Sequence, residues 1–343
     1  RDYSLAAGGG YLDGFCRMTL DAKILSALRN AESGVSGADL CRQLGISRTA
    51  VWARIEALRE RDYDIAANPH TGYRLLSSPD RLLAADLSAR LGKTRVIGRD
   101  IRVLRQTTST NDVIEQMARD GEPEGLVVFA ESQTHGRGRL GRRWSSPSGK
   151  GLWFSILLRP RLRPLETTQL TAATATAISR AIENETGLKP EIKWPNDIML
   201  NGKKVAGILT ELHAELDQIR HVILGIGIDA QQSPSDFPID LRAQATSLKI
   251  SLGRPVDRPA LATTLLRELD RDYTRIIHGQ FNELAEEWES RCDTLGRHVA
   301  ISTGTKTMRG RAETLDPNGA LLLRTDHGRL EPITGGDVEI LKS

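Results

Sequence analysis

A segment rich in glycine and arginine, GRGRLGRRW at positions 136–144, is the most distinctive chemical pattern of the chain. Its guanidinium groups, on Arg137, Arg139, Arg142 and Arg143, are fixed positive charges that repel one another unless an anion lies between them. The interleaved glycines leave the backbone free to approach a ligand closely. This combination predicts a loop that binds phosphate groups.

The same segment also satisfies the glycine pattern of dinucleotide-binding folds, through Gly136, Gly138 and Gly141. In that fold the glycines open a helix whose N-terminus holds a pyrophosphate. Here the residues SSPSGKG follow directly, and a strand pattern comes after them. The context therefore argues against a dinucleotide-binding fold. The density of glycines and arginines argues equally against an ordinary solvated turn.

Other polar residues could complete such a site. Lys193 stands in the motif KWPND, where Trp194 and Pro195 stiffen the chain that presents its ammonium group. An ammonium group is a compact charge that can bridge two anionic oxygens. The segment TTSTND at 107–112 follows a candidate strand and opens a candidate helix, so its short side chains lie where the polar end of a ligand could bind.

Three motifs in order, GRGRLGRRW, KWPND at 193–197 and KKVAGILTEL at 203–212, resemble the signatures of the biotin–protein ligases. The resemblance covers nearly everything after Met18 and is similar in layout to members that are also repressors of the biotin operon. It implies an enzyme that forms biotinyl-5′-adenylate from biotin and ATP. The biotinyl group is then transferred to a lysine of a biotin carboxyl carrier protein, a subunit of acetyl-CoA carboxylase.

The resemblance and the chemistry together suggest roles. Lys193 would supply positive charge where the biotin carboxylate meets the α-phosphate, Arg137 and Arg139 would hold phosphate, and Mg²⁺ would screen the departing pyrophosphate. The residues expected to contact biotin or biotinyl-adenylate are Ser109, Thr110, Asn111, Gln133, Arg137, Gly138, Arg139 and Lys193. Those expected to contact ATP are Arg142, Trp144, Lys204 and Gly207.

Several of these residues have plainer interpretations. Ser109 by itself is more often only the N-cap of a helix, and Lys193 by itself could be a lysine at a strand end. Trp144 could cover an adenine or belong to the core, and neither interpretation is preferred. Lys203, next to Lys204, is expected on a solvated face.

Two positions depart from the family pattern. Leu140 stands where the repressor-type relative has another arginine, so one phosphate contact is either absent or not essential. Asp229, in GIGID, stands where the family usually has asparagine. A negative charge there would disfavour ATP unless it faces magnesium or solvent, which puts the role of that strand end in question.

The elements around these motifs predict three domains of α+β class. Helices that start near Leu20 and are capped by Ser36 and Ser47, followed by the hairpin pattern YDIAANPHTGYRLL, indicate a winged helix-turn-helix. The middle of the chain mixes strands and helices and predicts a mixed sheet with flanking helices. Short alternating strands in the tail predict a small SH3-like β-barrel.

The boundaries follow from these patterns. We expect an extension of uncertain origin over residues 1–17, with Met18 as a possible natural start, a winged helix-turn-helix and linker over 18–80, a catalytic domain over 81–294, and the barrel over 295–343. The candidate strands of the catalytic domain are IRVLRQT, GLVVFAES, GLWFSILLRP, EIKWP, KVAGILTEL and HVILGIGID. A long amphipathic helix is indicated by Leu261, Leu265, Leu266, Leu269 and Tyr273.

Nucleic-acid recognition is expected from the second helix of the helix-turn-helix motif, which enters the major groove. Its candidate contact residues are Ser47, Arg48, Thr49, Trp52 and Arg54, with His70, Thr71 and Arg74 of the wing on phosphates. Nearby Glu56, Glu60 and Asp62 reduce the positive charge, so a purely structural or protein-binding role is the alternative. One such domain reads half a site, so we expect a homodimer when ligand is bound.

Composition limits the remaining choices. With 343 residues, 39% hydrophobic and 27% charged, and a net charge of +3, the chain has the composition of a globular protein whose basic patches are local. Three widely spaced cysteines and the absence of a long apolar run or leader pattern favour a cytoplasmic protein without membrane partners. Two rival functions stay open: a catalytically silent biotin-sensing transcription factor, and a lipoate–protein ligase.

Overall fold

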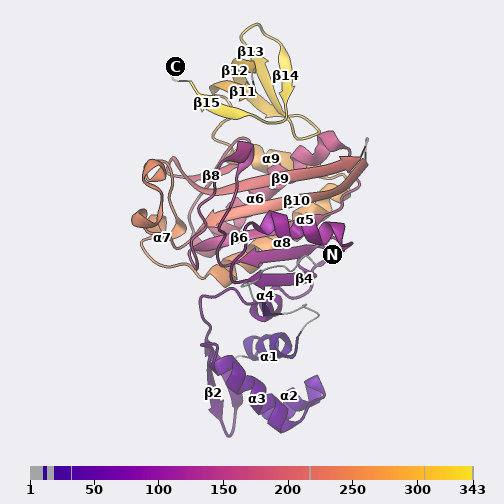
Figure 1. Cartoon of the computed structure of the whole chain (residues 1–343), viewed down its shortest axis with the longest axis vertical. Coiled ribbons are helices and arrows are strands. Elements are labelled where there is room, and N and C mark those ends of the chain that lie inside the picture. Colours follow the sequence, from indigo (N-terminus) through magenta and orange to yellow (C-terminus); the bar gives the residue numbers. More distant parts are fainter. Residues whose placement is uncertain (1–10, 14–18, 32, 216–217, 305, 342–343) are drawn as a thin grey trace, which may run out of the picture.

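The computed structural model describes residues 11–13, 19–31, 33–215, 218–304 and 306–341. Figure 1 shows three parts along the long axis: a small helical domain with a hairpin, a large sheet with helices, and a small β-domain carrying the C-terminus. This is the predicted α+β arrangement. The expected extension over residues 1–17 lies mostly outside the described residues, although Tyr11–Asp13 form a strand, β1, that pairs with the large sheet. No helix of the described residues is long and apolar enough to cross a membrane.

The N-terminal domain has the predicted helices and wing. Its elements are α1 (Leu20–Arg29), α2 (Gly37–Leu44), α3 (Arg48–Arg59), β2 (Asp64–Asn68) and β3 (Gly72–Ser77). The Ser36 and Ser47 side chains accept the backbone N–H of Asp39 and Ala50, as N-caps do, at a gain of about 1 kcal/mol each. Apolar residues at helical spacing in α1 (Ile24, Leu25 and Leu28) and α3 (Val51, Ile55 and Leu58) are buried in one core that also includes the wing residue Ile65.

The large domain is built on an eight-stranded sheet in the order β1-β4-β5-β6-β10-β9-β8-β7. Only β4 and β5 are parallel among the described pairings, so the sheet is mixed, as expected. The strands are β4 (Asp100–Leu104), β5 (Leu126–Ala130), β6 (Gly151–Leu158), β7 (Glu191–Lys193), β8 (Asp197–Leu200), β9 (Lys203–Glu215) and β10 (Gln218–Asp229). The short strand β8 was not among the predicted strands.

Helices cover the two faces of this sheet unequally. One face packs against α6 (Thr168–Thr186), α8 (Arg258–Ile277) and α9 (Phe281–Arg291), which are in contact with one another. The other face carries α5 (Thr110–Arg119), which lies on β5, β6 and β10. The apolar stripe predicted for α8 is fully or almost fully buried. The helix α5 covers only part of its face of the sheet. The glycine–arginine loop covers the parts of β9 and β10 around Gly207 and Gly227.

The linker between the first two domains ends in a buried ionic network. Arg258, only 1% exposed, donates to Glu131 at 2.8 Å and to Asp80 at 3.1 Å. The next helix along the chain, α4 (Ala84–Leu91), carries the buried Asp86, which accepts a hydrogen bond from Arg29 of α1 at 2.6 Å. These contacts tie the helical domain and its linker to the end of β5.

The C-terminal part is the expected small β-domain. Its five strands, all antiparallel, are in the order β14-β13-β12-β11-β15. They are β11 (His298–Thr303), β12 (Lys306–Leu315), β13 (Leu321–Thr325), β14 (Leu330–Ile333) and β15 (Asp337–Ile340). The Gly319 and Gly328 turns have positive φ, as the hairpin signals require.

Candidate active site and nucleic-acid interface

A polar network joins the start of α5 to β6. The backbone N–H of Thr110 donates to the Gln133 side chain at 2.8 Å, and the Thr110 hydroxyl lies 2.7 Å from that of Ser155. Ser155 in turn donates to Asn111, and Gln133 donates to Ser146 at 2.9 Å. Three residues expected to bind ligand, Thr110, Asn111 and Gln133, are therefore brought together. Ser155 was missed because an isolated serine in an apolar strand gives no signal.

Ser109 occupies the N-cap position of α5, but its hydroxyl makes no capping hydrogen bond. The side chain of Gln133 satisfies the first backbone N–H of the helix instead. Ser109 is 3% exposed. Ser109 therefore occupies the N-cap position without the capping hydrogen bond, and its hydroxyl has no hydrogen-bond partner among the described residues.

Glycines form a floor under the loop. Gly207 and Gly227 are cross-strand partners, and a Cβ on Gly227 would lie 2.6 Å from the Trp144 indole, whereas one on Gly207 would lie 2.9 Å from it. A Cβ on Gly225 would lie 2.4 Å from the Asn111 side chain. We call Gly207, Gly225 and Gly227 the glycine floor. Only glycine allows the indole and the α5 amide to approach the sheet this closely.

Trp144 lies across this floor rather than inside the main core. Its ring makes an edge contact with Trp153, with centroids 6.3 Å apart, and the Lys204 ammonium lies 5.2 Å from its centroid. The indole Nε1 is buried without a hydrogen-bond partner among the described residues. A buried N–H without an acceptor is costly, so a ligand acceptor here would be favourable. This favours the ligand-covering interpretation of Trp144.

Lys193 lies in the same cross-strand row as the floor. Its backbone is paired with Asp197, Asp197 with Gly207, and Gly207 with Gly227, so their side-chain positions face the same side of the sheet. Lys193 is half-buried and has no carboxylate within 4.0 Å among the residues that the structure describes. The neighbouring Lys204 is instead paired with Asp197 at 2.5 Å. Lys193 is therefore a cation that is available to an anionic ligand.

The first loop arginine is engaged by carboxylates. Arg137 pairs with Asp112 and, at 3.1 Å, with Glu211, which also accepts from Asn111 at 2.8 Å. Burial acts to lower the pKa of Arg137, but the hydrogen bonds that it donates to Glu211 and Asp112 outweigh this effect and raise that pKa. Glu211 and Asp112 were not among the predicted site residues. Arg137 is thus positioned next to the α5 network, with a paired charge rather than a free one.

Arg139 extends to the other side of β9. It donates to Asn196 at 3.0 Å, and burial lowers the pKa of its guanidinium, which the charges of Asp337 and Asp197 only partly offset. A cavity of about 190 Å³ adjoins it, lined also by Ile208 of β9 and by residues of α6. The structure therefore does not bring Arg137 and Arg139 together on one phosphate.

The tip of the loop lies outward. Gly138 donates to the carbonyl of Arg142 at 2.7 Å and closes the turn. Leu140 is 73% exposed and has a φ of 56°, a left-handed conformation that is uncommon for leucine. Arg142 pairs with Asp337 of β15, so it contacts the C-terminal domain rather than the glycine floor. Lys203 is exposed, in agreement with its expected solvated face.

Asp229 is buried at the end of β10. Burial raises the pKa of its carboxyl well above the ordinary value, although a hydrogen bond from Gln232 and the charge of Lys204 act against this. The environment therefore favours the neutral carboxyl group, which has nearly the shape of asparagine. The anticipated conflict between a negative charge here and ATP is reduced by this environment.

The candidate DNA-binding residues are exposed. Ser47, Arg48, Thr49, Trp52 and Arg54 of α3 are all exposed, and so are His70, Thr71 and Arg74 of the wing. Arg48 and His70 line an open groove of about 460 Å³ between the start of α3 and the wing. Arg54 differs from the others because it lies 3.4 Å from Asp21 of α1.

Comparisons with known proteins follow the same division. Family models match residues 21–74 (HTH domain), 101–229 (Biotin/lipoate A/B protein ligase family) and 294–341 (Biotin protein ligase C terminal domain). The Bifunctional ligase/repressor BirA of Bacillus subtilis is 39% identical over 306 residues, which is 89% of this chain and 94% of that protein. The BirA of Escherichia coli is 30% identical, and the match covers 94% of this chain and 97% of that protein.

A solved structure gives the same result for the fold. The biotin protein ligase from Aquifex aeolicus in complex with biotin and ATP superimposes with a TM-score of 0.60 at 30% identity. The match covers 71% of this chain and 99% of that one. The resemblance found in the three sequence motifs is therefore confirmed, and the chain belongs to the biotin–protein ligase family, among relatives that are bifunctional ligase/repressors.

Proposed function

We propose that this protein forms biotinyl-5′-adenylate from biotin and ATP and transfers the biotinyl group to a lysine of a biotin carboxyl carrier protein. The observation that carries the proposal is the position of Lys193, a half-buried cation without a carboxylate partner, in one row with the glycine floor beneath Trp144. Two anions must meet for the carboxylate to attack phosphorus. Lys193 is suited to bridge them.

The residues around Lys193 would divide the ligand between them. Ser109, Asn111 and the Gln133 network would receive the polar end of biotin, and the flat adenine would pack against the Trp144 indole, which itself rests on the glycine floor. The buried indole N–H would donate to the ligand. The loop over this surface would exclude water, which matters because the mixed anhydride hydrolyses readily.

Magnesium is not provided for by this chain alone. Among the described residues near the floor, Asp112 and Glu211 are paired with Arg137, and Asp197 is paired with Lys204. Asp229, the fourth carboxyl group, is buried, and burial raises its pKa. As paired here, these groups do not present a set of free carboxylates to Mg²⁺. Mg²⁺ commonly binds through substrate phosphates and keeps several waters, so it would arrive with ATP.

A transfer assay tests the ligase activity directly. The protein is incubated with labelled biotin, ATP and a carrier domain, and Lys193→Ala is compared with the exposed neighbour variant Lys203→Ala. We expect loss of adenylate formation by on the order of 100-fold in the first, because one electrostatic stabiliser is removed, and parental rates in the second. An unchanged single-turnover rate in Lys193→Ala would remove this lysine from the mechanism. Transfer of lipoate in place of biotin, or no transfer by the parent, would support the rival functions.

We propose further that biotinyl-5′-adenylate promotes a homodimer that binds operator DNA and represses transcription. The support is the exposed surface on α3 and the wing, which reads only half a site per chain. If the ligand strengthens the dimer, the dimer must strengthen ligand binding by the same free energy. Sedimentation and operator binding with and without biotin plus ATP test this. Identical association states in both conditions would refute it.

A further inference from the structure

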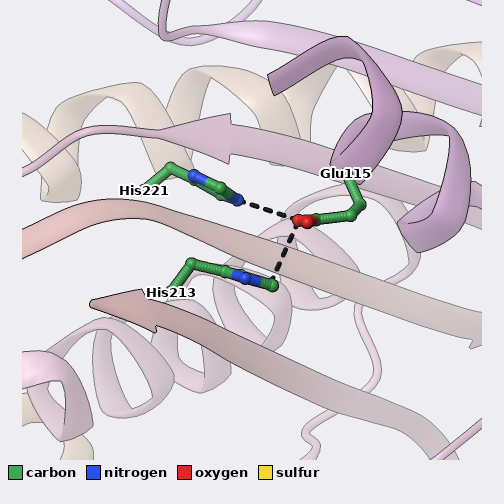
Figure 2. Close-up of side chains that lie close together, drawn as sticks. All are labelled: Glu115, His213 and His221. Carbon is green, nitrogen blue, oxygen red and sulfur yellow. Dashed lines mark hydrogen bonds and ion pairs between the residues drawn. The ribbon is translucent and has the colours of Figure 1, made fainter. Parts of the chain in front are cut away.

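Two histidines and a glutamate converge on the sheet face that carries α5, beyond the proposed ligand site. Figure 2 shows His213 of β9 and His221 of β10 with both rings directed to the carboxylate of Glu115 of α5. The Nε2 atoms of His221 and His213 lie 2.8 Å and 3.1 Å from the same oxygen, Oε2. The two rings are stacked, with centroids 4.4 Å apart and planes 14° apart.

The backbone holds this arrangement in place. His213 and His221 are directly opposite each other in the β9–β10 pairing, so their side chains must share a face. Glu115 comes from the middle of α5, which packs against β10. Three elements therefore fix three donor groups independently of one another. Ligands that are held in advance by rigid elements bind a metal ion at little cost in ordering.

The two oxygens of the Glu115 carboxylate have different partners: the imidazoles share one, and an arginine binds the other. Arg119, one helical turn further on α5, takes Oε1 of Glu115 at 2.7 Å and is largely exposed. A metal ion would replace the Glu115–histidine contacts, with the carboxylate ionised and both imidazoles neutral, as metal ligands must be.

We propose that Glu115, His213 and His221 form a binding site for a divalent transition-metal ion, Zn²⁺ in the first instance. The three ligand atoms all lie within 4.8 Å of one another. Bonds of about 2.0–2.1 Å to nitrogen and oxygen in a tetrahedral site place ligand atoms roughly 3.3 Å apart, so an ion can enter after small movements. Two imidazoles and one carboxylate suit zinc and its neighbours, whereas Mg²⁺ and Ca²⁺ prefer oxygen ligands.

The fourth coordination position would be open. The His213 side chain is 38% exposed, whereas that of His221 is 9% exposed, so the ion would enter from the His213 side and keep a water there. The ion would fasten α5 to the β9–β10 hairpin. Asn111 lies one turn before Glu115 on α5, and Glu211 lies two residues before His213 on β9. The metal site would therefore stiffen the same two elements that position Arg137.

Cobalt titration of the full-length protein provides the first test, with Co²⁺ as the probe because its visible absorption reports coordination. We expect one Co²⁺ per chain with the intense absorption of a four-coordinate ion, displaced by Zn²⁺, and without the sulfur-to-metal band that any of the three cysteines would produce as a ligand. Neither biotin nor ATP is needed, so the outcome does not depend on the ligase activity. A weak spectrum typical of six-coordinate aqueous cobalt would overturn the proposal.

Variants then assign the ion to these side chains. His213→Gln removes a partly exposed ligand, and Glu115→Gln keeps the shape but removes the charge. We expect Zn²⁺ affinity to fall by about 100-fold or more in each, because even a supporting partner of a metal ligand contributes about 10- to 100-fold. The matched control is His298→Gln, which alters an exposed histidine paired with Asp326 in the C-terminal domain and should leave affinity unchanged.

Thermal unfolding completes the design. Zn²⁺ should raise the unfolding temperature of the parent and of His298→Gln, since an ion that binds only the folded state stabilises it. It should not raise that of His213→Gln or Glu115→Gln, and all variants are checked without metal for a parental fold. Equal Zn²⁺ affinity and equal stabilisation in parent and variants would overturn the assignment, and the cobalt spectrum of the parent still decides the proposal if a variant fails to fold.

Discussion

Replacement of Gly227 by alanine tests whether the glycine floor sets the position of the Trp144 indole. The new Cβ would lie 2.6 Å from the indole Cε2 and Nε1. Non-bonded carbon atoms pack at about 3.5–4.0 Å, so the ring would have to move by roughly 1 Å. Overpacking of this kind costs about 1–3 kcal/mol.

The cost should appear mainly in ligand binding. Trp144 belongs to a loop, whereas Gly227 lies in the middle of a sheet, so the indole is the part that yields. We expect a non-hydrolysable biotinyl-adenylate analogue to bind roughly 5- to 150-fold more weakly, which is 1–3 kcal/mol at about 1.4 kcal/mol per factor of ten. Titration calorimetry measures the affinity, and thermal unfolding measures the share of the cost that falls on the fold.

A second glycine provides the control. A Cβ on Gly37, in the first turn of α2, would lie 3.6 Å from the Tyr73 ring, which is ordinary contact. Gly37→Ala makes the same chemical change with room for it, and should leave ligand affinity unchanged. Parental affinity together with parental stability in Gly227→Ala would refute the reasoning, because it would mean that the indole does not rest on the floor.

Three more predictions concern buried charges and the loop. We expect Arg139 to exchange Asn196 for the ligand phosphate when biotinyl-adenylate binds. Arg139→Gly should then release the adenylate about 10- to 150-fold faster, since one charge-assisted hydrogen bond of about 1.5–3 kcal/mol is lost. Stopped-flow dissociation measures this, and a parental rate would show that the arginine stays on Asn196 as a structural residue. Asp229→Asn should keep activity and raise stability at pH 8 by on the order of 1–3 kcal/mol. Because the pKa of the Asp229 carboxyl is raised in the folded protein, the parent loses stability as the pH rises. The stability advantage of Asp229→Asn over the parent should therefore shrink toward pH 4, which denaturant unfolding at several pH values would measure. Arg258→Met should lower the free energy of unfolding by about 3–5 kcal/mol, because it leaves the Glu131 carboxylate buried without its cation. A decrease of less than about 1 kcal/mol would contradict this.

Local sequence patterns predicted the elements well where one element buries one regular face. The stripe Ile24, Leu25 and Leu28 of α1 is buried, and the caps Ser36 and Ser47 lie where the structure begins α2 and α3. The strand β8 (Asp197–Leu200) escaped prediction because its first residue was assigned to the motif KWPND and the remaining three are too few to show a period. A strand so short is defined by its pairing with β7 and β9 rather than by its own periodicity.

The candidate site was predicted in its residue types more than in its pairings. Sequence motifs identify Asn111 and Arg137, but their common partner Glu211 lies 100 and 74 residues away along the chain. Such pairs follow from how strands are ordered in the sheet, which composition and spacing do not determine. The same holds for Glu115, His213 and His221, which come together only because α5 lies across β10.

The buried network around Arg258 determines how far the DNA-binding surface can move. Asp80, in the loop between β3 and α4, is held by the guanidinium that also binds Glu131, and Asp86 is bound to Arg29 of the first helix. Two ionic contacts therefore hold the helical domain against the ligase domain, which a flexible linker alone would not do. In a symmetric dimer, such contacts would fix the distance between the two recognition helices, and with it the number of base pairs between operator half-sites. Operators with bases inserted between the half-sites would then be rejected, whereas a flexible linker would tolerate them.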